Sequence, residues 1–383
     1  MMSKTILVLG GGIGGLVVAN GLRKKLAREH EVILVDKKTK HEFNPSFLWV
    51  LTGKRKVPQI CRNLQLLEKK GIQYINAEVR NIDVGNKQVN TSVKNISYDF
   101  LVIALGAELA PESIPGLSES GYNLYQLEEI PKLRDSVKNF TSGTLMILVC
   151  KLPFKCPAAP YESALLMDYL LREKGLRDKI EIKLFTPEGI PMKVAGSKVG
   201  EAVKQMLRER EIVFNPNHQP TSIDPEKKEV HFGDKKENFD LLVYVPPHKI
   251  PKVLEKTDLV NETGWVGVNP RTLETKFQGV FSLGDAVNIK LPSGLALPKA
   301  GVFAHGEAEV VAKNIVAQVN EEQPKHEFGG KGSCFLEIGY GKAAYAKGNF
   351  YQEPEAQVKM WGPGGIWHWG KILFEKWWLW RWF

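Results

Sequence analysis

The chain has 383 residues, 43% of them hydrophobic and 25% charged, a composition typical of a globular protein with room for two domains. Its net charge of +9 suits an anionic partner, but no basic run with interleaved aromatic residues occurs in its body, so nucleic-acid binding is not expected. Four cysteines are too few for a disulfide scaffold, and any disulfide is expected to be catalytic. We expect no signal peptide and no membrane-spanning helix, because the chain enters a strand directly and lacks a long uncharged apolar run.

The N-terminal segment has the pattern of a dinucleotide-binding unit. A predicted strand at 5–9 precedes a predicted helix at 16–26, and a second strand at 32–35 ends at Asp36. Three glycines with G-x-G-x-x-G spacing lie between the first strand and the helix: Gly10, Gly12 and Gly15. They permit a tight turn, close approach of the backbone to a pyrophosphate, and close packing of helix on strand. Asp36 follows about 20 residues on, where a carboxylate accepts hydrogen bonds from ribose hydroxyls.

Two later segments favour a flavin dinucleotide. YDFLVIALG (98–106) predicts a strand ending at Gly106, and GVFSLGDA (279–286) predicts another ending at Gly284 and Asp285. A helix is predicted at about 300–317, with Pro298 in its first turn, which would direct its positive end at the flavin pyrimidine. The set resembles FAD-dependent pyridine nucleotide–disulfide oxidoreductases. The resemblance implies FAD as cofactor, with Asp285 at the ribityl chain and Lys299 near the pyrimidine; no metal site is predicted.

An internal repeat predicts two copies of the same fold. Residues 69–106 and 208–247 share a pattern of helix end, strand, turn, short strand and buried strand. The segment 143–171 then takes the place of the first glycine loop, but it holds prolines, lysines and Cys156 where the glycines would be. Prolines lack the amide donors that a pyrophosphate needs, so we expect the second copy to bind NAD(P)H poorly.

The predicted fold class is therefore α/β, with two Rossmann-like domains, one inserted in the other, and a C-terminal amphipathic membrane-anchoring region. The predicted domains are an FAD-binding domain from residues 1–115 and 272–318, a second domain at 116–271, and a C-terminal redox-cysteine and anchor region at 319–383.

Three further segments resemble sulfide:quinone oxidoreductases: FKCPAAPYE (154–162), GSCFLEIGYGKAA (332–344) and HWGKILFEKWWLWRWF (368–383). The resemblance implies that Cys156 and Cys334 form a redox pair that oxidises sulfide to polysulfide, with Cys334 next to the flavin. It also implies that Glu162 handles protons, that Phe335 lies against a membrane quinone, and that two electrons pass through FAD. The other interpretations are two inert core thiols, and for Glu162 a first-turn acid that complements the helix dipole.

The sequence departs from the family pattern in one place. Many members have a third redox cysteine near 110–130, where ESIPGLSESGYNLYQLEE has none. This absence favours a two-cysteine variant and places a covalent flavin link in question, with Cys150 as the substitute. Otherwise Cys150, at a strand end, and Cys61, in a predicted helical stretch, are interpreted as core cysteines. His305 is interpreted as an ordinary helix histidine.

The C-terminal tail is rich in tryptophan. Seven of the nine tryptophans lie from Trp361 onward. From residue 366 the pattern predicts a helix with one polar side and one apolar side. The polar side is predicted to hold His368, Lys371, Glu375 and Lys376; the apolar side is predicted to hold Ile366, Trp369, Leu373, Trp377 and Trp380. Such a helix is typical of an interfacial membrane anchor, although a dimer contact or core-docking helix has the same pattern. We expect its deletion to spare sulfide-dependent flavin reduction.

Three other functions remain open from sequence. A type II NADH:quinone oxidoreductase would need a glycine-rich second loop. A flavin subunit of a sulfide:cytochrome c dehydrogenase would be exported and would not need the tail. A membrane-docked flavoprotein redox sensor would have a reducible flavin without quinone turnover. The sequence leaves the oligomeric state open, including a homo-oligomer.

Overall fold

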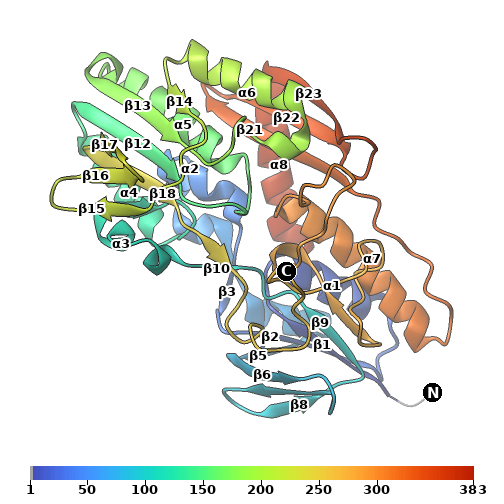
Figure 1. Cartoon of the computed structure of the whole chain (residues 1–383). Coiled ribbons are helices and arrows are strands. Elements are labelled where there is room, and N and C mark those ends of the chain that lie inside the picture. Colours follow the sequence, from blue (N-terminus) through green and yellow to red (C-terminus); the bar gives the residue numbers. More distant parts are fainter. Residues whose placement is uncertain (1–2) are drawn as a thin grey trace.

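The computed structural model describes residues 3–383 and contains two five-stranded parallel sheets (Figure 1). The first sheet has the order β20 (Val280–Ser282), β9 (Phe100–Ile103), β1 (Thr5–Leu9), β2 (Glu31–Asp36) and β5 (Gln73–Asn76). Helices α1 (Ile13–Lys25) and α7 (Gly301–Val319) pack together on it. The central strands are buried almost throughout, as parallel strands covered on both faces must be.

The second sheet repeats the first strand for strand. Its order is β11 (Tyr122–Asn123), β18 (Leu241–Val245), β12 (Gly143–Val149), β13 (Ile180–Phe185) and β14 (Val213–Asn215). The helices beside it are α4 (Glu129–Asn139), α5 (Ala159–Glu173) and α6 (Ser197–Glu209). The prediction of Rossmann-like parallel-sheet units in a mixed α/β fold is confirmed.

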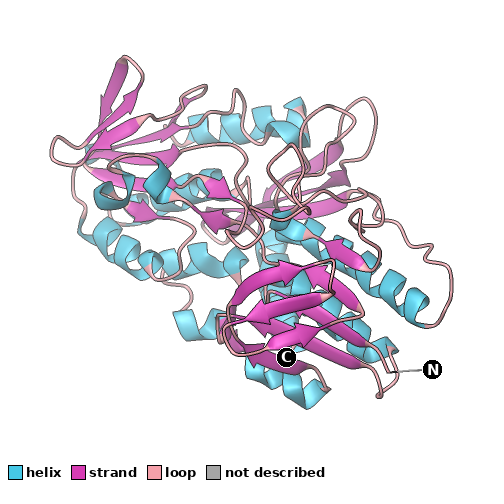
Figure 2. Cartoon of the chain, turned by 60° about the horizontal axis from the view of Figure 1, so that its bottom comes forward, coloured by secondary structure: helices cyan, strands magenta, loops and turns pink. Residues whose placement is uncertain are grey.

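Each copy also has a three-stranded antiparallel sheet in the same place. One is formed by β6 (Val79–Asp83), β7 (Gln88–Thr91) and β8 (Asn95–Ser97). The other is formed by β15 (Ser222–Asp224), β16 (Glu229–Phe232) and β17 (Lys235–Asn238). These small sheets and the parallel sheets stand out as separate groups of strands in Figure 2. Each copy therefore has one parallel sheet and one small antiparallel sheet, and this shared architecture explains the internal repeat of the sequence.

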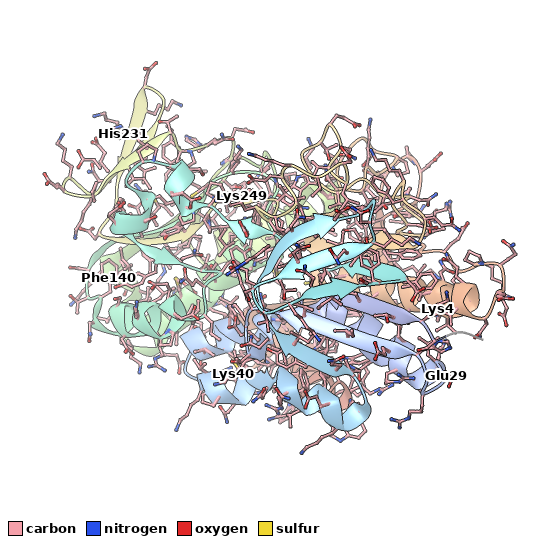
Figure 3. The ribbon with its side chains drawn as sticks, turned by 90° about the horizontal axis from the view of Figure 1, so that it is seen from below. Lys4, Glu29, Lys40, Phe140, His231 and Lys249 are labelled. Carbon is pink, nitrogen blue, oxygen red and sulfur yellow. The ribbon has the colours of Figure 1, made fainter. Side chains whose placement is uncertain are left out.

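The two chain segments that join the parallel-sheet units pair with each other. They form β10 (Glu108–Leu109) and β19 (His248–Lys249), which are antiparallel. In Figure 3, Lys249 lies between the part that carries Lys4 and the part that carries His231. Beyond β19, the residues Ile250, Leu254, Leu259 and Trp265 pack in the core of the first unit. The domain boundaries stay a prediction, but these contacts place the return to the first unit before residue 272.

The C-terminal region consists of an antiparallel sheet and a helix. The sheet contains β21 (Lys331–Gly339), β22 (Lys342–Asn349) and β23 (Gln357–Gly364), and the helix is α8 (Gly365–Arg381). Helix α5 packs on β21, and α8 packs on β22. The C-terminal part of α8 and the residue after it also reach α7, because the ring of His305 contacts the rings of Trp377, Trp378 and Trp382. Among the described residues, no helix is both long and apolar enough to span a bilayer.

Two local predictions are wrong. Cys61 begins the short strand β4 (Cys61–Asn63), which pairs with β3 (Lys40–Glu42), and so does not lie in a helix. Pro298 precedes the first turn of α7, because that helix begins at Gly301. Two short helices complete the chain: α2 (Phe47–Leu51) and α3 (Leu117–Ser120).

Candidate active site

The glycine loop after β1 is closed on its inner side and open on its outer side. Gly10 has a φ of +101°, and a Cβ there would collide with the carbonyl oxygen of Ala104. A Cβ on Gly15 would collide with the carbonyl oxygen of Gly10, so the helix packs directly on the strand. A Cβ on Gly12, the N-cap of α1, would meet nothing within 4 Å. The amide end of α1 is therefore open to a ligand.

Acidic groups follow two strands of the same sheet, one on each side of β1. The Asp36 carboxylate accepts hydrogen bonds from the backbone N–H of Gly11 (2.5 Å) and of Lys38 (2.7 Å). On the other side, Asp285 follows β20, and the N–H of Gly284 donates to Glu307 of α7 (2.7 Å). Burial raises the pKa of Glu307 to about 7. The two strand ends therefore present carboxyl groups at the same edge of the first sheet.

Lys299 is buried and is held by the protein itself. Its Nζ donates to the carbonyl oxygens of Asp285 and Val287, both at 2.8 Å, and lies 3.5 Å from the centre of the Trp265 ring. Burial lowers its pKa to about 8. These contacts fix the segment after Gly284, where φ is +71°, and a role at the flavin pyrimidine stays a prediction. Gly106, with a φ of +72°, ends the loop after β9.

The loop after β12 docks on the first unit. Cys156 has a φ of +50°, and its N–H donates to the carbonyl oxygen of Lys299 (2.6 Å). Lys155 forms a parallel bridge with Lys299, and the Tyr125 hydroxyl donates to the Cys156 carbonyl (3.2 Å). The Cys156 amide is thus occupied by the segment that leads into α7. This contact supports the prediction that the second loop binds NAD(P)H poorly, because that amide is not free for a pyrophosphate.

The second cysteine comes from β21. Cys334 and Cys156 are both partly buried, and both thiols are free in the structure. Burial and, to a smaller extent, the Glu162 carboxylate raise the pKa of Cys334 to about 11, although the Lys371 ammonium opposes both effects. Burial raises the pKa of Cys156, and the charge of Cys334 adds to the rise. The fold therefore brings the two thiols together with one carboxylate and one ammonium.

Glu162, in the first turn of α5, is the carboxylate of this group. It is buried, and its Oε1 accepts from Lys371 Nζ at 2.5 Å. Burial raises the pKa of the Glu162 carboxyl group, and the ion pair with Lys371 opposes that rise. For Lys371, burial alone would lower the pKa, but Glu162 and Glu337 more than offset it, so the pKa is raised. Lys371 therefore stays cationic in the interior.

The sequence pattern predicts two faces for α8 without saying which one turns inward, and in the structure the polar face is the buried one. His368, Lys371 and Glu375 are buried, and only Lys376 of the predicted polar side is exposed. His368 Nδ1 donates to Glu337 (2.8 Å), and Glu375 accepts from Arg55 (2.8 Å). The apolar side is exposed: Ile366 74%, Trp369 64%, Leu373 66%, Trp377 41% and Trp380 75%. The polar face turns inward because each of these three buried groups finds a hydrogen-bonding partner there: Glu162 for Lys371, Glu337 for His368 and Arg55 for Glu375.

The other sequence-predicted residues lie around this group. Phe335 is half-buried, packs on Tyr345 (ring centroids 5.0 Å apart) and lies beside Gly370 of α8. Cys150 is fully buried at the end of β12, and burial raises its pKa. Cys61 lies in β4, where burial also raises its pKa. The site contacts of Lys371 and Glu337 were not predicted from the sequence; the only signal was charge of both signs on one helix side.

Three comparisons assign a family. A profile of pyridine nucleotide-disulphide oxidoreductases matches residues 4–147. The mitochondrial sulfide:quinone oxidoreductase of Dictyostelium discoideum is 30% identical, over 89% of this chain and 77% of that protein. The mouse mitochondrial sulfide:quinone oxidoreductase is 28% identical, over 91% and 79%. The solved structure of the Aquifex aeolicus enzyme superposes with a TM-score of 0.90 at 25% identity, over 99% of this chain and 91% of that one.

The chain belongs to the sulfide:quinone oxidoreductase family. It is an FAD-dependent oxidoreductase, and its residues fit that cofactor. The open amide end at Gly12 suits a pyrophosphate, and the Asp36 carboxylate beside Gly11 is placed for a ribose. The strand end at Asp285, next to the N-terminus of α7, suits the flavin half of the dinucleotide.

Proposed function

We propose that this chain oxidises hydrogen sulfide at a Cys156–Cys334 redox pair and delivers two electrons to a membrane quinone. The observation that carries the proposal is the loop after β12. In a nicotinamide-binding copy this loop would cradle a pyrophosphate, whereas here it holds Cys156 against the first unit and next to Cys334. The placement joins a sulfur-attacking group to the edge of the sheet where the cofactor residues Gly284 and Asp285 lie.

The chemistry follows from the oxidised pair. Hydrosulfide attacks Cys156 Sγ, the Cys156–Cys334 bond breaks, and its electron pair leaves on Cys334 as a thiolate. The product is a persulfide on Cys156, and further rounds release polysulfide. Glu162, with its raised pKa, is suited to hold and return protons near both sulfurs. FAD, when bound, supplies the two-electron acceptor between the thiolate and the quinone.

The exposed apolar face of α8 supports a membrane contact. Ile366, Trp369, Leu373 and Trp380 are each more than 60% exposed and share one side of the helix. Aromatic and aliphatic residues in that arrangement are typical of a helix that lies at the headgroup level of a bilayer. We also propose that a quinone ring enters from this side and lies against Phe335, because the Phe335 ring packs beside Gly370 of the same helix. We therefore assign the protein to the membrane surface, where its quinone is dissolved.

The decisive experiment is an anaerobic titration of the flavoprotein with sulfide and, separately, with NADH. Sulfide is expected to bleach the flavin in the wild type, and NADH is not, because the second loop lacks glycines, holds prolines and uses its Cys156 amide in a contact with Lys299. The Cys156→Ser variant should keep FAD and lose the response to sulfide. Bleaching by NADH without a response to sulfide would instead indicate an NADH:quinone oxidoreductase. Loss of the sulfide response in Cys150→Ser but not in Cys156→Ser would assign Cys150 as the partner.

A further inference from the structure

We propose that Lys371 of the C-terminal helix is a positioning residue for the sulfur chemistry: it holds Glu162 in place and stabilises the thiolate that Cys334 becomes. The inference rests on the proposed function, since it concerns the same two cysteines. It adds a residue from a part of the chain that the sequence pattern assigned to the membrane surface. The side chain is 5% exposed and enters the interior from the inward face of α8.

Lys371 contacts α5 and α2, and its charge also interacts with Glu337 of β21. Its Nζ donates to Glu162 of α5 and lies 5.0 Å from the centre of the Trp49 ring of α2. Glu337, three residues after Cys334 on β21, is fully buried and also raises the pKa of Lys371. His368, one helical turn before Lys371, donates to Glu337. The Lys371–Glu162 ion pair is therefore flanked by the Glu337 carboxylate and the His368 imidazole, while Lys155 and the Tyr125 hydroxyl lie on the Cys156 side.

The next charged pair on α8 lies outside this group. Glu375 accepts from Arg55 at 2.8 Å and from the Ser46 hydroxyl at 2.5 Å. Because Glu375 and Arg55 compensate each other, neither is free to serve the cysteines. Lys371 follows Gly370, where a Cβ would lie 3.3 Å from the ring of Phe335, the residue after Cys334. Its positive charge lowers the pKa of both Cys156 and Cys334.

The opening of the disulfide creates a charge that needs compensation. Hydrosulfide enters with one negative charge and forms an S–S bond to Cys156, and that charge leaves on the sulfur of Cys334. The electron pair stays on the protein in this step, so no further oxidant is needed until the quinone accepts it. A thiolate at a buried position beside the Glu162 carboxylate is unfavourable unless a cation lies close by. Lys371 provides that cation, and its removal would leave Glu162 as an unopposed negative neighbour of Cys334.

The test measures the thiolate of Cys334 directly, without sulfide. The reduced holoprotein is alkylated with iodoacetamide over a range of pH, and the peptides containing Cys334 and Cys61 are quantified by mass spectrometry. In Lys371→Met, the alkylation profile of Cys334 is expected to shift to higher pH by roughly 1–3 units, the shift typical of a lost opposite charge at close range. Because the pKa of Cys334 is about 11 in the wild type, the shift is measured below that pKa, as an alkylation rate that is roughly 10- to 1000-fold lower at the same pH. Alkylation of Cys61, which lies in β4, should keep its wild-type profile.

Matched variants separate charge from structure. Lys376→Met removes the same charge from an exposed position of the same helix and should leave the Cys334 profile unchanged. Lys371→Arg keeps the charge and should restore most of the wild-type profile. If Lys371→Met does not fold, the Glu162→Gln/Lys371→Met double variant removes both members of the ion pair. Its Cys334 profile should lie between the raised profile of Lys371→Met and the lowered profile of Glu162→Gln, and so near the wild type.

The outcomes are distinct. The inference is overturned if folded Lys371→Met has the same Cys334 alkylation profile as the wild type. It is also overturned if the Cys334 profile of Lys371→Arg shifts as far as that of Lys371→Met. If Lys371→Met does not fold, the inference is overturned when the Cys334 alkylation profile of Glu162→Gln/Lys371→Met lies a full pH unit or more above that of the wild type. The rate of flavin reduction by sulfide at neutral pH should fall at least about tenfold in Lys371→Met, which matches a shift of one unit. A wild-type flavin that does not respond to sulfide would refute the proposed function and leave the alkylation result intact.

Discussion

The outward face of α8 offers a test of membrane contact that leaves the buried chemistry untouched. Trp369 and Trp380 are 64% and 75% exposed, and neither contacts the cysteines. A tryptophan side chain has about 200 Å² of surface, so each ring leaves about 130–150 Å² open to solvent. At about 25 cal/mol per Å², each ring is worth about 3–4 kcal/mol when it leaves water completely. If the rings are half immersed, the pair contributes about 3 kcal/mol, roughly a hundredfold in the partition coefficient.

The assay is flotation of the Trp369→Ser/Trp380→Ser variant with lipid vesicles. The variant is expected to stay largely in solution, while sulfide still bleaches its flavin, because Glu162 and Lys371 keep their contact on the inner face. A matched control, Val93→Ser, changes an apolar residue that is 67% exposed and lies far from α8 in the sequence, and it should float as the wild type does.

Two results would refute the reasoning about this face. Flotation of the double variant equal to that of the wild type would show that the membrane contact lies elsewhere. Loss of self-association in solution, with flotation unchanged, would assign the exposed face to contact with a second copy of the chain.

Three further predictions concern the interior. Cys156→Ser and Cys334→Ser should keep FAD but lose sulfide-dependent quinone reduction in a spectrophotometric assay, because a lone thiolate cannot re-form the disulfide, whereas Cys61→Ser should change little. Deleting residues 366–383 should abolish sulfide-dependent flavin bleaching as well as flotation, contrary to the expectation from sequence, because it removes Lys371. Burial lowers the pKa of His41 from 6.5 to about 4, so the unfolded chain binds its proton more readily and the free energy of unfolding should fall as pH drops from 6.5 to 4. Urea unfolding should show a smaller pH slope in His41→Gln, and an unchanged slope would contradict this assignment.

The parts of the fold that were predictable from sequence rest on local signals. The glycines at 10, 12 and 15 satisfy steric demands of one turn, and these demands can be recognised without knowing the rest of the chain. The repeat was visible because both copies need the same order of strands and turns. By contrast, the pairing of Cys156 with Cys334 entered only through resemblance to a family. No local sequence pattern predicts that β21 lies near the loop after β12, because their proximity depends on how α5, which follows that loop, packs on β21.

Helix α8 shows why periodicity alone gave half of the answer. The spacing of its charged and apolar residues fixed which side chains share a face, but it did not fix which face turns inward. Water would normally favour the apolar face inside, and the structure reverses this because the charged face meets specific partners: Glu162 for Lys371, Glu337 for His368 and Arg55 for Glu375. The reversal is favourable only if something apolar also covers Trp369 and its neighbours outside. Helix α8 therefore carries Lys371 of the cysteine site on its inner face and the surface that we assign to the membrane on its outer face. A substitution on either face should be tested for both sulfide-dependent flavin reduction and vesicle flotation.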